Sequence, residues 1–127
     1  MRKYLDDISV TERPDTWNKY DSRQQQWQKE RELYGFDERE TWALNYSFYL
    51  WLYERLKRFV EICCIDLDYH KFEYKGTEYT QRQMINMMLE RLEFSFKPEY
   101  NDCDEKMFAY VSEIEQIWAT ILPSMWW

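Results

Sequence analysis

The chain has 127 residues and a net charge of -7, from 17 basic and 24 acidic side chains. Aromatic residues make up 20% of it, whereas there are only 2 Gly and 3 Pro. This length predicts one domain, and the shortage of turn formers favours long helices joined by short loops. We therefore expect a single mostly α domain, 1–127, with about four helices in a compact bundle. An acidic chain also repels free nucleic acid at long range, so sequence-specific nucleic-acid binding is not expected.

Cysteine usage and the N-terminal residues bear on the cellular compartment. Three cysteines, an odd number, do not form a disulfide framework. The opening MRKYLDDISV lacks the apolar segment of a signal peptide. We therefore expect a reducing cytoplasm.

Residues 1–13 have no sustained period, which predicts an N-terminal arm. Pro14 suits a first helical turn, and residues 15–34 carry Trp17, Tyr20, Trp27 and Tyr34 near one stripe of a helix. Gly35 is a typical residue for ending that helix.

The second helix is predicted from Asp37, which has Glu40 at capping-box spacing, to about Cys64. It carries two apolar stripes. The first is Trp42, Tyr46, Tyr49, Tyr53, Leu56 and Val60, and the second is Leu44, Phe48, Trp51, Arg55, Arg58 and Ile62. An amphipathic surface helix needs one stripe, so this helix is either central in the bundle or partly covered by a second subunit, with Trp42, Tyr46 and Tyr49 at the interface. Its apolar run, 42–53, is shorter than the roughly 20 residues of a membrane span, so no membrane contact is expected.

The C-terminal half predicts a small hairpin or a loop at 65–79, with Lys75-Gly76 as the turn. Thr80 and Gln83 have capping-box spacing and open a third helix to about residue 96. A fourth helix starts at Asp102 and Glu105 and ends at Pro123. The terminal Trp126 and Trp127 either pack back into the core or form an exposed interaction anchor; packing back is favoured because two free indoles promote aggregation.

The most suggestive cluster for ligand binding lies on the second stripe of the long helix. Trp51, Arg55 and Arg58 follow at i, i+4 and i+7, with Phe48 one turn earlier and Lys57 adding positive charge. An indole stacks on a nucleobase, and guanidiniums make planar, bidentate contacts with phosphate. The ordinary alternative is a solvated face, on which Arg58 pairs with Glu54 and Lys57 with Glu61.

Metal and catalytic sites are weaker candidates. Cys63, Cys64, His70 and Cys103 include enough zinc ligands but lack a CxxC pair, so the cysteines are expected to pack as small hydrophobes. Paired carboxylates for magnesium would come from two acidic pairs, Glu90 with Glu93 and Asp102 with Glu105. No nucleophile-histidine arrangement or glycine-rich phosphate loop is present in the sequence. We therefore expect no catalytic residues, metal or cofactor.

Residues 35–59, GFDERETWALNYSFYLWLYERLKRF, resemble a family of short phage and prophage proteins. Its members carry a GF-x4-TW segment before an aromatic helix that ends in an RLK-type basic cluster. The matching positions are Gly35, Phe36, Thr41, Trp42, Arg55, Leu56, Lys57, Arg58 and Phe59. The match ends before ICCIDLDYHKFEYKGTEY and supplies no catalytic residues. It implies a small binding protein in the cytoplasm of a bacterial host that antagonises a defence system.

Two mechanisms fit this setting, and a third class stays open. The first is sequestration of a small anionic nucleotide signal by a homo-oligomer, through Trp51, Arg55 and Arg58. The second is inhibition of a defence protein, of the anti-CRISPR type, through the acidic residues Asp66, Asp68, Glu73 and Glu78. The third is an all-α nucleotide pyrophosphatase-like hydrolase. The first is favoured because it explains why aromatic residues and arginines share one helical face.

Overall fold

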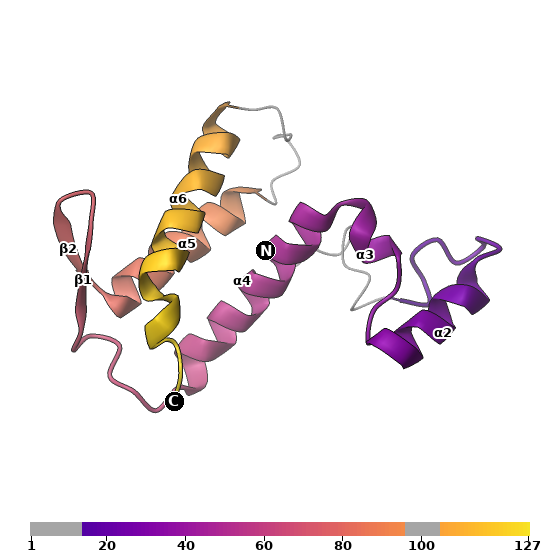
Figure 1. Ribbon diagram of the computed structural model, residues 1–127, viewed down its shortest axis with the longest axis horizontal. Coiled ribbons are helices and arrows are strands. Elements are labelled where there is room, and N and C mark those ends of the chain that lie inside the picture. Colours follow the sequence, from indigo (N-terminus) through magenta and orange to yellow (C-terminus); the bar gives the residue numbers. More distant parts are fainter. Residues whose placement is uncertain (1–13, 96–104) are drawn as a thin grey trace. The chain divides into compact units, whose positions relative to one another are not determined.

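The computed structural model describes residues 14–95 and 105–127, and the predicted arm at 1–13 lies outside them. The described chain is mostly α-helical with one small antiparallel hairpin, which confirms the predicted fold class (Figure 1). The chain divides into two compact units, Met1–Leu52 and Tyr53–Trp127, and the boundary falls inside one helix. Within the described ranges, none of the helices combines the length and hydropathy needed to cross a lipid bilayer.

The first unit contains α2, Gln24–Tyr34, which begins later than the predicted residue 15. The chain before it forms turns, and Asn18 has a positive φ of 59° that a helix does not accept. Asp21 accepts a hydrogen bond from the backbone N–H of Arg23 at 2.9 Å and so turns the chain into the helix. The side-chain hydrogen bond from Arg23 lowers the pKa of Asp21 to about 2. Gly35 ends the helix as predicted, with φ of 86° and its N–H bonded to the Arg31 carbonyl.

The predicted long helix is broken in two. A short helix, α3, spans Arg39–Trp42, and α4 spans Leu44–Ile62, because Ala43 between them has non-helical angles. The carboxylate of Asp37 accepts a hydrogen bond from the backbone N–H of Arg39 at 3.0 Å, at the start of α3. It also accepts hydrogen bonds from the side chains of Arg31 and Arg39, so the same carboxylate takes part in an ion pair.

The two stripes of α4 differ in burial. Tyr49, Tyr53 and Leu56 of the first stripe are buried, together with Leu50 and Leu52. Leu44, Phe48 and Trp51 of the second stripe are exposed. Trp42, which begins the first stripe, is 49% exposed, so it is not a core residue of the protomer.

In the second unit, β1, Lys71–Tyr74, pairs antiparallel with β2, Thr77–Thr80, which confirms the hairpin. Lys75 and Gly76 both have positive φ, 52° and 79°. Two such residues in succession are what a type I′ turn requires. The turn fixes the register, with Phe72 opposite Tyr79.

The helix α5, Gln81–Ser95, follows the hairpin directly. The predicted capping box is formed, because the Gln83 N–H bonds to Thr80 Oγ1 at 3.1 Å and the Thr80 N–H bonds to Gln83 Oε1 at 2.8 Å. Its buried apolar side chains are Met84, Ile85, Met88, Leu92 and Phe94, and the first four recur at helical spacing.

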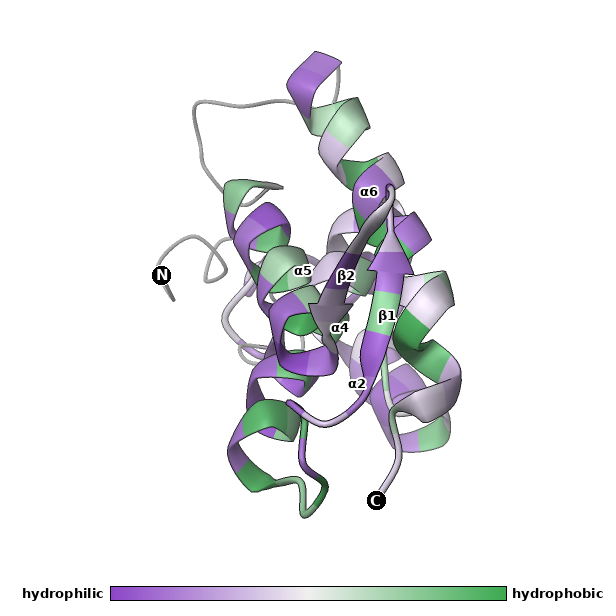
Figure 2. Cartoon of the chain, turned by 90° about the vertical axis from the view of Figure 1, so that its left-hand side faces the viewer, coloured by the Kyte–Doolittle hydropathy of each residue, from purple (hydrophilic) through white to green (hydrophobic). Residues whose placement is uncertain are grey.

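The last helix, α6, spans Glu105–Ile121 and continues into a 3₁₀ turn, η1, Leu122–Ser124. Green and purple residues alternate along α6 in Figure 2, as expected for a helix with one apolar face. It packs against α5 and β1. Arg91 and Glu113 form an ion pair between α5 and α6, and Lys75 Nζ lies 3.5 Å from the same carboxylate. This ion pair lowers the pKa of Glu113, chiefly through the hydrogen bond from Arg91.

Candidate functional site

Four of the predicted ligand-binding residues, Phe48, Trp51, Arg55 and Arg58, lie on the exposed face of α4. The rings of Phe48 and Trp51 are nearly parallel, with 13° between their planes and centroids 6.4 Å apart. They are 44% and 48% exposed, so they form an aromatic surface in the first unit. Because α4 is one continuous helix, Arg55 and Arg58 follow in the same row one and two turns later, and both are exposed.

Lys57 does not belong to this row. Its Nζ lies 5.4 Å from the centroid of the Tyr53 ring, a cation-π contact on another side of the helix. The predicted pairing of Arg58 with Glu54 is also not what the structure shows, because Arg58 bonds to Glu61 at 3.1 Å. Both partners of this pair are mostly exposed, so it holds Arg58 only weakly.

The predicted interface residues of α3 and α4 have different surroundings. Tyr49 is buried, and Tyr46 is half-buried with its ring edge-on to that of Tyr49 at 6.3 Å. The Trp42 ring lies 6.3 Å from Trp17 and 5.7 Å from Trp27. Trp42 therefore contributes to an indole cluster of the first unit while keeping half of its surface exposed.

Sequence reasoning did not find the buried ion pair beneath that cluster. The side chains of Asp37 and Arg39 are fully buried, with Arg39 Nη2 2.7 Å from Asp37 Oδ2. The Arg39 guanidinium lies 4.2 Å from the Trp27 ring centroid. Burial raises the pKa of Asp37, but the hydrogen bonds from Arg39 and Arg31 outweigh it and hold that pKa below its ordinary value. The pair is a structural element of the first unit, because both side chains are closed off from ligands.

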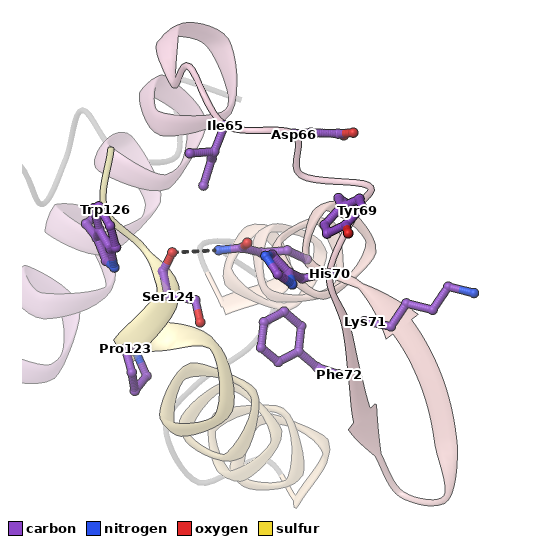
Figure 3. Close-up of a pocket in the computed structure, with 10 residues that line it drawn as sticks. Ile65, Asp66, Tyr69, His70, Lys71, Phe72, Pro123, Ser124 and Trp126 are labelled. Atoms are coloured by element: carbon purple, nitrogen blue, oxygen red, sulfur yellow. Dashed lines mark hydrogen bonds between the residues drawn. The ribbon is translucent and has the colours of Figure 1, made fainter.

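The second unit contains a pocket of about 500 Å³. It lies between the segment that leads into β1, the first residue of α5 and the chain after α6 (Figure 3). Its lining residues combine aromatic rings with a few polar groups and are Ile65, Asp66, Tyr69, His70, Lys71, Phe72, Gln81, Pro123, Ser124 and Trp126. Its volume falls within the range of small-molecule sites.

This pocket brings together three residues that the sequence suggested separately, Asp66, His70 and Trp126. The expectation that the terminal tryptophans pack into the core is wrong, because Trp126 and Trp127 are 74% and 57% exposed. Asp68 is not a lining residue; it pairs with Arg82 at 3.1 Å. Gln81 and Ser124 had no signal in the sequence, since they become neighbours only when the chain after α6 returns to the start of α5.

The described metal and carboxylate candidates do not form a cluster. Among residues 14–95 and 105–127, no group of three or more potential ligands could hold a metal ion. Cys63 is half-buried and Cys64 exposed. The Glu93 carboxylate accepts a hydrogen bond from the Tyr53 hydroxyl at 2.9 Å, whereas Glu90 is exposed. Asp102 and Cys103 lie outside the described residues.

Comparison with protein-family models, with curated proteins and with solved structures gives no match for this chain.

Proposed function

We propose that this chain is a non-enzymatic, phage-encoded binding protein that antagonises bacterial defence by sequestering an anionic nucleotide signal. The observation that carries the proposal is the exposed, nearly parallel pair Phe48 and Trp51, on a helix that continues into Arg55 and Arg58. An aromatic face binds a base by stacking in a sequence-tolerant way. Guanidiniums one and two turns further along the helix are positioned to contact phosphate oxygens.

The proposed binding unit is a homo-oligomer. A helix face encloses a ligand on one side only, whereas small-molecule sites usually bury most of their ligand. A second copy related by two-fold symmetry would present the same face from the opposite side, because a two-fold interface uses the same surface on both subunits. A nucleotide with two bases matches such symmetry best. The phage setting is supported by the resemblance of residues 35–59.

The test is calorimetric titration with a panel of mononucleotides and of linear and cyclic dinucleotides, with the solution mass measured by light scattering. We expect one ligand per oligomer. Arg55→Ala and Arg58→Ala should each lower the affinity by about tenfold or more, as the loss of a charged hydrogen bond does. Lys57→Ala is the matched control, since it removes the same charge from another side of α4. A monomer that binds none of the panel, or arginine variants that behave like the control, would refute the proposal.

The anti-CRISPR-type alternative is favoured by one observation in the hairpin. Glu73 and Glu78 lie directly opposite each other in the β1–β2 register, and both are exposed. Like charges in this arrangement destabilise a hairpin, whereas they would be favourable against a basic nucleic-acid groove. Under this alternative, Glu73→Gln with Glu78→Gln should abolish salt-sensitive binding to a purified defence effector, and the exposed Glu90→Gln should not. Binding that is the same in both variants would exclude the hairpin as the binding surface.

A further inference from the structure

Gln81 has unusual surroundings for a pocket residue. It is the first residue of α5 and 1% exposed, and its backbone N–H bonds to the His70 carbonyl. Its side-chain Nε2 donates to the Ser124 carbonyl at 3.4 Å, close to the upper limit for a hydrogen bond. A hydrogen bond of this length is weak, so the carboxamide is suited to a ligand that offers it closer partners.

The carboxamide offers a specific pattern. Its Nε2 carries two hydrogens, of which Ser124 uses one, and its Oε1 accepts. A donor beside an acceptor is complementary to the edge of a nucleobase, as in glutamine pairing with adenine.

The walls of the pocket supply flat apolar surfaces. In Figure 3, His70 and Phe72 extend toward Ser124, Ile65 extends into the space above them, and Trp126 lies on the opposite side. The His70 ring is held edge-on to the Tyr69 ring, 5.0 Å away and at 84°. Aromatic walls around a buried hydrogen-bonding group are typical of sites for single bases.

Charge argues against a phosphate in the pocket. Of the described residues that line it, Lys71 is the one lysine or arginine, and its side chain extends away from the space in Figure 3. Asp66 also extends outward. A charged ligand would lose its hydration on entering the pocket and would find few charged partners there. A neutral heterocycle has no such loss to offset.

We propose that this pocket binds an uncharged planar nitrogen heterocycle of the nucleobase class, with Gln81 reading its edge and Trp126 stacking on its face. The site goes beyond the proposed function and shares no residue with the α4 face. It depends on side chains of the second unit alone.

The test is titration of the full chain with adenosine, guanosine, cytidine and uridine, observed through the indole N–H signals in ¹H–¹⁵N spectra. At least one nucleoside should shift the Trp126 signal at millimolar concentration. Trp126→Ala should weaken binding by about tenfold, as the loss of a stacked ring does, and Trp127→Ala should not. The control is well matched, because Trp127 is the neighbouring exposed indole and does not line the pocket.

A second variant tests the recognition step. Gln81→Met keeps the length of the side chain but removes its donor and acceptor, and its spectrum shows whether the fold is retained. We expect a similar loss of affinity in the folded variant. No shift with any of the four nucleosides would overturn the proposal. Equal binding by the Trp126 and Trp127 variants, or full binding by folded Gln81→Met, would also overturn it.

Discussion

Replacing Arg39 by alanine should strongly destabilise the first unit. The guanidinium donates to Asp37 Oδ1 at 3.0 Å and to Asp37 Oδ2 at 2.7 Å. It also donates to the backbone carbonyls of Pro14 and Trp17, which ties the turns before α2 to α3. The substitution leaves a buried carboxylate and two carbonyls without these donors.

The expected loss of stability depends on the hydrogen bonds that Asp37 keeps in the variant. Removing one partner of a buried ion pair costs about 3–5 kcal/mol. Arg31 Nη1 still bonds to Asp37 at 2.8 Å, so we expect the lower end, about 3 kcal/mol. The matched control is Arg58→Ala, which makes the same chemical change at a pair that is 68% and 57% exposed. Such a surface pair contributes about 0–1 kcal/mol.

The assay is urea unfolding followed by tryptophan fluorescence, together with hydrogen exchange of the amides of residues 24–42. Exchange resolves the first unit from the second, because local opening is reported residue by residue. Arg39→Ala should speed exchange throughout this segment, whereas Arg58→Ala should not. If both variants lose the same small free energy of unfolding, the pair is not a structural element of the core and the reasoning is refuted.

Two further predictions concern the second unit. Thr80→Ala removes the hydroxyl that caps α5 and should lower the free energy of unfolding by about 1 kcal/mol, whereas Thr77→Ala, an exposed strand position, should change it less; equal losses in urea unfolding would contradict the capping role. Glu113 has a lowered pKa, so its stabilising contribution is present above its ordinary pKa of 4.5 and lost as pH falls through the folded-state value. Glu113→Gln should therefore flatten the acid side of the melting-temperature profile, and an unchanged profile would contradict this.

Features set by short-range chemistry were predictable. The Thr80 and Gln83 box, the glycine after α2 and the Lys75-Gly76 turn each depend on residues within four positions of one another. The mostly α class followed from composition and helical periodicity. These features needed no knowledge of tertiary contacts.

The features that the sequence did not predict have a common physical cause. The capping spacing of Asp37 did not reveal that two arginine side chains, six and two residues away, also bind its carboxylate, or that the helix breaks at Ala43. Periodicity found both stripes of the predicted helix but did not show where burial begins along the first one, in which Trp42 is half exposed and Tyr49, Tyr53 and Leu56 are buried. The pocket was missed because its walls come from segments more than forty residues apart in sequence, such as Gln81 and Ser124.

The indole cluster of the first unit has an optical consequence. Trp42 stands between Trp17 and Trp27, at 6.3 Å and 5.7 Å and at large interplanar angles. Transition dipoles this close and this skewed couple as excitons, and their rotational strength adds to the peptide bands in the far ultraviolet. Trp42→Phe should therefore change the far-ultraviolet ellipticity while every helix stays folded. The exciton couplet lost in this variant would be a spectroscopic signature of the indole cluster.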